Sequence, residues 1–351
     1  MISAQELEKI RVPKFSISTS LIINAAKEKG LQFEPLPERA FRISDTKTSY
    51  YFKGTSFPCN GMVSSALSCN KYFLRKMLKR HSVPVPKTIR LRYASQWQRA
   101  ITGSLHFPLV VKPTSASHAH GSSMNIINED ELRRAVRRAF DYMKKNKAGT
   151  RVLVEEYFAG EDLRFFVIGD QVVSVLQREP AYIIGDGINK VRKLIANFNQ
   201  EWQSPIKYDL PLCPIPIDTE TARRLRRQGK TLNSVPKKGE KVTLRWNANI
   251  STGGRAIDVT DIVHPNLKKL AIQIAHIAKL EITGVDILCK DITSEDTSSK
   301  NVCVLETNDS PGIDIHHFPF IGKGENISGM ILDYIFKKDT VLAETDSTVQ
   351  L

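Results

Sequence analysis

The chain has 351 residues, a formal net charge of +14, and a globular composition with 41% hydrophobic and 25% charged residues. Its longest apolar runs fall far short of the about 20 residues that a membrane-spanning helix needs, and its first residues lack the apolar core of a signal peptide. The five cysteines are unclustered, which indicates reduced thiols rather than a disulfide framework or a zinc site. We therefore expect a cytoplasmic protein of two or three domains or subdomains, with no membrane association.

The first segment, residues 1–69, is predicted to be a small α/β unit. Apolar periodicity favours helices over residues 19–29 and 61–68. Short strands are predicted between them, over residues 31–36, 41–44 and 49–52.

The second segment, residues 70–149, begins with a helix predicted over residues 71–80. Later in it, an amphipathic helix is predicted to begin after an Asn128 cap and to stop near Gly149. That helix carries much of the positive charge, at Arg133, Arg134, Arg137, Arg138, Lys144 and Lys145. A solvated basic face explains this charge, and no aromatic residues are interleaved with it as stacking on single strands would favour. We therefore do not expect nucleic-acid binding from this pattern.

The third segment, residues 150–337, is richer in strands, and residues 338–351 are expected to form a flexible tail. Strands are predicted over residues 152–156, 163–168, 171–177, 242–246, 284–288 and 302–308. Helices are predicted over residues 190–199, 218–228 and 265–279.

A lysine ends an apolar strand at Leu109-Val110-Val111-Lys112, ahead of the small-residue loop 115–123. A lysine is expensive to desolvate there unless an anion meets it, and a loop of Ser, Ala and Gly lets backbone N–H groups approach phosphate oxygens. Taken alone, this pattern also fits an ordinary hairpin.

Two late strands carry carboxylates where an apolar strand would continue, Asp286 in one and Glu306 in the other, with Asn308 following. Strict alternation would place Val302, Val304, Glu306 and Asn308 on one face. Three oxygen ligands at one sheet end suit a magnesium ion that bridges phosphates. The alternative is a solvated sheet face.

Taken in order, Lys71, Lys112, the small-residue loop, residues 155–162, Asp286 and residues 306–308 resemble the pattern of the ATP-grasp superfamily. Within it, the chain is most similar to the ATP-grasp module of cyanophycin synthetases and then to the glutathione-synthetase-like domain of bifunctional bacterial glutathione enzymes. The matching stretches, within roughly residues 70–335, are 178–181, 184–187, 229–236, 244–245, 248–254 and 256–258.

The resemblance implies an α/β ATP-grasp fold, in which two α/β subdomains clamp ATP beside the small N-terminal unit. It implies that nucleotide is held by Lys71, Lys112, Ser117, His118, Gly121, Glu155, Phe158 and Asp162, and Mg²⁺ (Mn²⁺ can substitute) by Asp286, Glu306 and Asn308. The implied catalytic residues are Arg245, Asn249 and Lys112, and the candidates for gripping substrate are Arg178, Ser251, Gly253, Gly254, Ser310 and Gly312. A surface salt bridge for Arg178 and plain turn chemistry for Ser310 and Gly312 are the alternatives.

The resemblance also implies an ATP-dependent carboxylate–amine ligase that forms an amide through an acyl phosphate. Its partners would be small carboxylate and amine substrates such as amino acids or short peptides, and the chain could form a homo-oligomer. A small-molecule kinase and a non-catalytic nucleotide- or polyanion-binding protein are the alternatives.

Two departures from the family pattern stand out. The lid loop has Ala119 and His120 where the family is richer in glycine, which alters backbone freedom at closure, and the roles of His118 and His120 stay open. The sequence ends after the ATP-grasp part, without the further domains of cyanophycin synthetases. We therefore expect it not to make that polymer alone and to use a different acceptor or donor.

Overall fold

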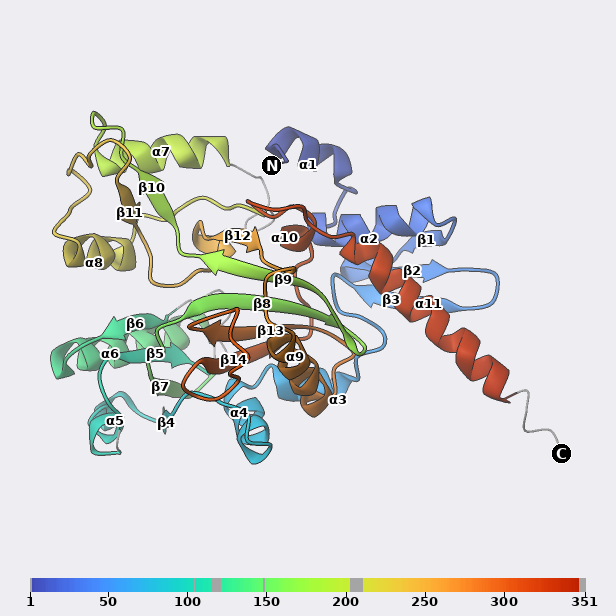
Figure 1. The fold of residues 1–351 in the computed structure, drawn as a ribbon, viewed down its shortest axis with the longest axis horizontal. Coiled ribbons are helices and arrows are strands. Elements are labelled where there is room, and N and C mark those ends of the chain that lie inside the picture. Colours follow the sequence, from blue (N-terminus) through green and yellow to red (C-terminus); the bar gives the residue numbers. More distant parts are fainter. Residues whose placement is uncertain (1, 104, 115–120, 148, 203–210, 347–351) are drawn as a thin grey trace.

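Two antiparallel sheets, one of five strands and one of four, lie at the centre of the fold (Figure 1). The computed structural model describes residues 2–103, 105–114, 121–147, 149–202 and 211–346. A three-stranded sheet and a two-stranded ribbon belong to smaller units beside the two central sheets. The predicted mixed α/β class is confirmed. No helix in the described part of the chain is both long enough and apolar enough to cross a membrane.

The five-stranded sheet has one apolar face and one face that turns polar at one end. Its strands, in spatial order, are β12 (Arg255–Asp258), β9 (Gln171–Glu179), β8 (Glu161–Ile168), β13 (Ile282–Cys289) and β14 (Val302–Asn308). Alternate residues of β8, Leu163, Phe165 and Val167, are fully buried against α9 (Pro265–Ala278) and α4 (Lys71–Arg80). The intervening residues Asp162 and Arg164 are therefore left for the opposite face.

The four-stranded sheet is covered by one helix in the same way. Its strands, in spatial order, are β4 (Thr88–Leu91), β7 (Val152–Glu156), β5 (Leu109–Pro113) and β6 (Ser123–Ile126). Leu109, Val111, Val152 and Val154 join a core with α6 (Glu129–Asn146), while the short α5 (Arg99–Thr102) lies at the side of β4. The other face of this sheet is left with the polar residues of β5 and β7.

The predicted cap of α6 is confirmed, but its end differs from the prediction. The side-chain oxygen of Asn128 accepts a hydrogen bond from the backbone N–H of Glu131 at 2.9 Å. The helix ends before Gly149, because Lys147 itself adopts the left-handed conformation with φ 52° and donates its N–H to the Met143 carbonyl. A non-glycine residue in that conformation could not be read from the sequence.

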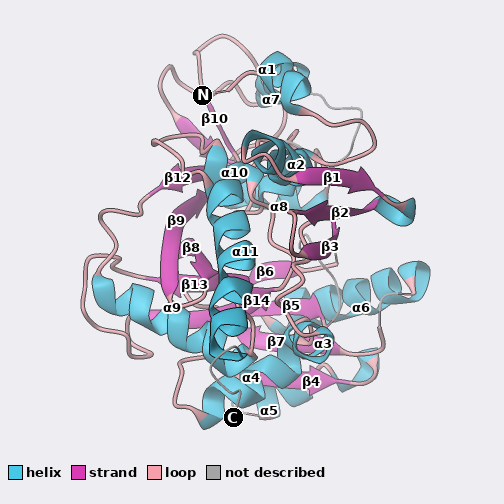
Figure 2. Ribbon diagram, turned by 90° about the vertical axis from the view of Figure 1, so that its right-hand side faces the viewer, coloured by secondary structure: helices cyan, strands magenta, loops and turns pink. Residues whose placement is uncertain are grey.

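The N-terminal unit packs against the last helix of the chain. Its elements are α1 (Ala4–Ile10), α2 (Ile17–Glu28), β1 (Gln32–Pro35), β2 (Ala40–Ser44), β3 (Ser49–Lys53) and α3 (Met62–Ser68). Phe41 and Phe52 stack at its centre with ring centroids 5.1 Å apart. The long α11 (Ile327–Asp346) lies beside α2, and Ile331 and Ile335 are buried in the same core (Figures 1 and 2). The expected tail from residue 338 therefore starts within a helix, and residues 347–351 lie outside the described residues.

The remaining unit contains the ribbon β10 (Tyr182–Ile184) and β11 (Lys241–Thr243), with α7 (Val191–Glu201) and α8 (Thr219–Arg227). The strand predicted over residues 242–246 is shorter than expected, because pairing with β10 ends at Thr243. After Thr243, the backbone N–H of Leu244 donates a hydrogen bond to the Ala181 carbonyl at 2.7 Å. Residues 245–251 are thereby free of the ribbon.

The proposed division at residues 69, 149 and 337 remains a prediction. Two packing facts bear on it. β7 pairs with β4 and β5, so the four-stranded sheet continues past residue 149. Leu74 and Leu78 of α4 are buried in the core under the five-stranded sheet rather than under the four-stranded one.

Candidate functional site

A cavity of about 840 Å³ lies between the polar faces of the two central sheets. The four-stranded sheet contributes Val110, Lys112 and Glu155 to its wall. The five-stranded sheet contributes Asp162 and Asp286 among others. Residues that are far apart in sequence thus meet at one place because both sheets turn their apolar faces away from it.

Asp286 and Glu306 are cross-strand neighbours on β13 and β14, at the wall of this cavity. The strand register shifts at this point: Asp286 pairs with Glu306, but the next residue, Ile287, pairs with Val304. Leu305 is therefore an extra residue in a β-bulge.

Because of this bulge, the predicted strict alternation of faces along β14 is wrong. Val302 and Val304 are fully buried in the core behind the sheet, whereas Glu306 shares the face of Asp286 and lines the cavity. Strict alternation would have put Val304 and Glu306 on the same face. The extra residue at Leu305 reverses the face of everything after it, which brings the two carboxylates together.

Positively charged side chains contact both carboxylates. The Lys71 ammonium lies 2.8 Å from a Glu306 oxygen. Asp286 accepts hydrogen bonds from Arg164 on both carboxylate oxygens, the one to Oδ2 at 2.9 Å, and the same Oδ2 lies 3.0 Å from Arg178. Burial alone raises the pKa of both carboxyl groups, but Lys71 on Glu306, and Arg164 with Arg178 on Asp286, outweigh it and hold both pKa values below the ordinary range. Both groups are therefore carboxylates at neutral pH.

A second buried charge cluster lies on the side of the four-stranded sheet. Glu155 is only 2% exposed, accepts a hydrogen bond from Arg75 of α4, and lies 3.0 Å from the Lys112 ammonium. Burial lowers the pKa of Arg75 to about 10. Burial also lowers the pKa of Lys112 well below its ordinary value. The Arg75 charge acts in the same direction, and the Glu306 carboxylate opposes both. This cluster joins the two sheets, because Arg75 also donates to the Leu305 carbonyl at 3.3 Å.

The residues at the sheet end fit a hard divalent cation. Two carboxylates face the cavity, and Asn308, which lines it too, has a buried side-chain nitrogen without a partner in the described part of the chain. Carboxylate and amide oxygens are the donors that Mg²⁺ takes in phosphate-binding sites, together with phosphate oxygens and water. Among the described residues no group of three or more His, Cys, Asp or Glu side chains forms a metal cluster.

The predicted nucleotide residues are only partly brought together. Phe158 and Asp162 line the cavity, and the Lys290 ammonium lies 5.2 Å from the Phe158 ring centroid. Gly121 has φ 70°, and an added Cβ would come within 2.8 Å of the Tyr142 ring, so its identity has a packing reason. Ser117 and His118 lie outside the described residues, as does His120.

The predicted substrate residues show the same division. Arg178, Ser251, Ser310 and Gly312 line the cavity, and so does Asn249, which was predicted to be catalytic. The Ser251 hydroxyl is buried and lacks a hydrogen-bond partner among the described residues. The Ser310 hydroxyl lies 2.6 Å from that of Ser56 in the N-terminal unit.

Gly253 and Gly254 shape the segment that carries Asn249 rather than line the cavity. Gly253 has φ 86°. A Cβ on Gly254 would approach the Ala248 carbonyl oxygen to 2.4 Å. Their role in this structure is therefore that of a tight turn.

Arg245, which we expected to face the reacting phosphoryl group, lies elsewhere in this structure. It is 6% exposed and is not part of the cavity wall. Its guanidinium donates to Asp218, which caps α8, and to the Thr221 hydroxyl at 3.3 Å. Asp218 therefore directs this arginine into the unit around α8, and Arg164 and Arg178 are the guanidinium groups found beside the carboxylates.

The residues of the cavity region that sequence reasoning missed include Arg75, Arg164, Trp246 and Lys290. A signal existed for two of them. Arg164 follows Asp162 by two residues in a strand and so shares its face. Arg75 follows Lys71 by four residues in a helix and so lies on the same side.

Two family models match the chain over most of its length. Residues 77–221 match the C-terminal part of D-alanine–D-alanine ligases, and residues 231–335 match the RimK-like ATP-grasp domain. This chain is an ATP-grasp protein. The resemblance predicted from the sequence is confirmed.

Relatives of this ATP-grasp protein include much longer enzymes. It is 31% identical over 323 residues to a cyanophycin synthetase from Nostoc sp., which covers 92% of this chain and 35% of the relative. It is 31% identical over 337 residues to a glutathione biosynthesis bifunctional protein from Clostridium perfringens, covering 95% and 42%. The chain thus spans less than half the length of these relatives, and the similarity extends into the N-terminal unit, beyond the expected start near residue 70.

A solved structure agrees with the fold. The crystal structure of a bifunctional glutathione synthetase from Pasteurella multocida superposes with a TM-score of 0.66 at 27% sequence identity. The match covers 93% of this chain and 44% of that one. Nearly all of the ATP-grasp protein therefore has a counterpart in that larger enzyme.

Proposed function

We propose that this protein is an ATP-dependent carboxylate–amine ligase that forms an amide bond through an acyl phosphate and releases ADP and phosphate. One observation carries the proposal: Asp286 and Glu306 lie side by side on the wall of a cavity of about 840 Å³ that Lys71 and Lys112 also line. Paired carboxylates with cations around them suit phosphoryl transfer, in which positioning and charge neutralisation do most of the work. The family membership and the relatives' amide-forming activities support it.

On this proposal Asp286, Glu306 and Asn308 hold Mg²⁺, or Mn²⁺ in its place. When bound, the ion neutralises charge on the phosphate oxygens. The chain's own cations then change partners: Lys71 and Arg164, which pair with these carboxylates here, become available to anionic oxygens of substrate. Lys112 remains held by Glu155 beside the same cavity.

The chain's remaining residues orient the nucleotide and the acid. Phe158 offers an apolar face and Asp162 a hydroxyl acceptor, which suits a base and a ribose. Arg178, whose Nε donates to Asp162 at 3.0 Å here, is the candidate for holding a substrate carboxylate once that pair opens. Ser251 supplies a hydroxyl that lacks a partner among the described residues. A carboxylate oxygen attacks the γ-phosphorus of ATP, the bond from that phosphorus to the β–γ bridging oxygen breaks, and ADP leaves. The amine then attacks the carbonyl carbon of the acyl phosphate, the C–O bond to the phosphate breaks, and inorganic phosphate and the amine's proton are released.

The substrates we propose are amino acids or short peptides, because the relatives' names are those of enzymes acting on such compounds. We also propose that the protein works in the cytoplasm, where its five cysteines would stay reduced, and that it self-associates.

Hydroxylamine trapping tests the function directly. Candidate carboxylates are incubated one at a time with the protein, Mg²⁺, ATP and hydroxylamine, and the hydroxamate is identified by its mass. A hydroxamate formed with equimolar ADP supports an acyl phosphate. A stable phosphorylated product formed without any amine would instead identify a small-molecule kinase.

A further inference from the structure

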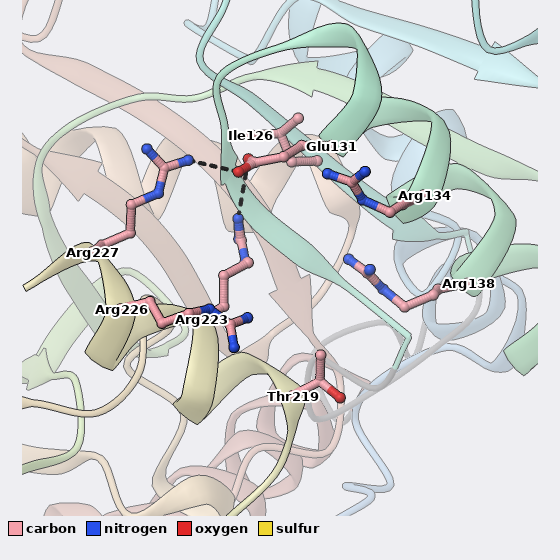
Figure 3. Close-up of a pocket in the computed structure, with 8 residues that line it drawn as sticks. All are labelled: Ile126, Glu131, Arg134, Arg138, Thr219, Arg223, Arg226 and Arg227. Atoms are coloured by element: carbon pink, nitrogen blue, oxygen red, sulfur yellow. Dashed lines mark hydrogen bonds and ion pairs between the residues drawn. The ribbon is translucent and has the colours of Figure 1, made fainter. Parts of the chain in front are cut away.

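A second hollow, of about 470 Å³, lies between α6 and α8 and is lined mainly by arginines. We call it the arginine hollow, and its guanidinium groups belong to Arg134, Arg138, Arg223, Arg226 and Arg227. Figure 3 shows those of α6 and those of α8 facing one another across the space beside Glu131. A solvated basic face on one helix would not produce this arrangement, because the charges come from two helices and line a concave surface.

The positive charge of the arginine hollow is only partly balanced. Glu131 is the one carboxylate of its lining among the described residues, and it pairs with Arg227 at 2.8 Å and Arg223 at 3.4 Å. The side chains of Arg134 and Arg226 make no hydrogen bond or ion pair within the described part of the chain. Glu220, next to the lining, pairs with Arg223 at 3.4 Å and lies 4.0 Å from Arg138, so five guanidinium groups face two carboxylates. Burial lowers the pKa of Arg138, the Glu220 carboxylate opposes this, and the neighbouring charges of Arg223 and Arg134 act in the same direction as burial. Guanidinium groups keep their charge at neutral pH, so this crowding favours the uptake of an anion.

The arginine hollow and the cavity share a wall. Ile126 of β6 lines the hollow, and Met124 of the same strand lines the cavity. Arg223 joins the two places, because it donates to the Met124 carbonyl and its guanidinium lies 4.5 Å from the Trp246 ring, which lines the cavity. A ligand that extends out of the cavity past β6 therefore arrives at the arginine hollow.

The chemistry of the arginine hollow favours carboxylates on an extended chain. Glu131 already shows a carboxylate bound between two of its guanidinium groups. Arg134 and Arg138 are one helical turn apart, about 6 Å. Carboxylates on alternate residues of an extended peptide are about 6.6 Å apart, so they match that spacing.

We propose that the arginine hollow is a subsite for an acidic peptide, which it holds by side-chain carboxylates while one end of the peptide occupies the cavity. The statement that one end of this peptide is the substrate in the cavity rests on the proposed ligase function. The statement that the hollow binds an acidic peptide rests only on the residues of the arginine hollow.

The test uses hexa-aspartate as the probe and isothermal titration calorimetry on the full chain at low salt, without ATP. The pocket variant is Arg134→Ala with Arg226→Ala, which removes two arginines that support no other described side chain. The matched control is Arg133→Ala with Arg137→Ala, which removes the same charge from exposed positions of α6 outside the hollow. We expect the pocket variant to weaken binding by about tenfold or more and the control by about twofold or less.

Equal weakening in both variants, or no binding of hexa-aspartate to the unaltered protein, would overturn the inference. So would tighter, hollow-dependent binding of inorganic tripolyphosphate or of a single-stranded DNA hexamer than of hexa-aspartate. If the pocket variant weakens hexa-aspartate binding but the protein forms no hydroxamate with any carboxylate, the ligase proposal is wrong and the peptide-binding proposal is supported.

Discussion

The buried contact between Arg75 and Glu155 makes a strong prediction about how α4 is tied to the four-stranded sheet. Both side chains are almost fully buried, at 4% and 2% exposed, and Glu155 also contacts Lys112 at 3.0 Å. Removing one partner of a buried ion pair costs about 3–5 kcal/mol, because the other charge is left without compensation. Glu155→Gln leaves two buried cations and should cost more than Arg75→Met, which leaves Glu155 with Lys112.

A double-mutant cycle measures this dependence. Urea unfolding at pH 7 is followed by tryptophan fluorescence, because Trp97 packs against the core of the four-stranded sheet. The double variant Arg75→Met/Glu155→Gln should be less destabilised than the sum of the single variants by about 2 kcal/mol or more. The exposed pair Lys53 and Glu38, 3.0 Å apart, is the control and should show a coupling below about 1 kcal/mol. A coupling energy below about 0.5 kcal/mol between Arg75 and Glu155 would contradict the prediction that the two residues depend on each other.

Three further predictions follow from particular contacts. Burial lowers the pKa of His317 to about 4, and its ring nitrogen accepts the Ser328 N–H at 3.0 Å, so the unfolded chain binds more protons below pH 6.5. Stability should therefore fall by about 3 kcal/mol as pH drops from 6.5 to 4, and His317→Gln should flatten that part of a urea-unfolding series; an unchanged slope would contradict it. Gly254→Ala should lower the free energy of unfolding by about 1–3 kcal/mol, because its Cβ would meet the Ala248 carbonyl oxygen at 2.4 Å, whereas Gly61→Ala, with nothing nearer than 3.5 Å, should change it by less than about 0.5 kcal/mol. Glu306→Ala should abolish Mg²⁺-dependent ADP formation while circular dichroism stays native, and normal turnover in that variant would remove Glu306 from the metal site.

Local patterns were enough to predict the elements that position the site. The helix over residues 71–80 and the strands over residues 152–156 and 302–308 form with the predicted bounds. Each has a strong periodicity and a clear boundary residue, such as Asn70, whose side chain accepts the Phe73 N–H. The order of lysines and carboxylates along the chain then indicated the family.

Contacts between segments that are distant in the sequence could not be predicted from local sequence patterns. The bulge at Leu305 decides which face Glu306 shares, yet it arises from pairing with β13 and leaves no mark in the alternation of β14 itself. Arg75 meets Glu155 across 80 positions of sequence, which no periodicity describes. Arg245 follows an apolar strand much as Lys112 does, and only the placement of Asp218 shows that it turns away from the cavity.

The arginine hollow was predicted only in part. The basic residues of α6 were visible in the sequence and suggested a solvated face. The second half of the hollow comes from α8, about 90 positions later, and a sequence pattern cannot show that two helices face one another.

The account depends most on a divalent cation bound between β13 and β14. The direct measurement is a crystal structure of the protein with Mn²⁺ and a non-hydrolysable ATP analogue, in which anomalous scattering locates the metal. We predict a peak in contact with oxygens of both Asp286 and Glu306, with Lys71 moved from its 2.8 Å contact with Glu306 toward the phosphates. A metal bound to the nucleotide alone, while Lys71 and Arg164 keep their pairs with the two carboxylates, would contradict the account.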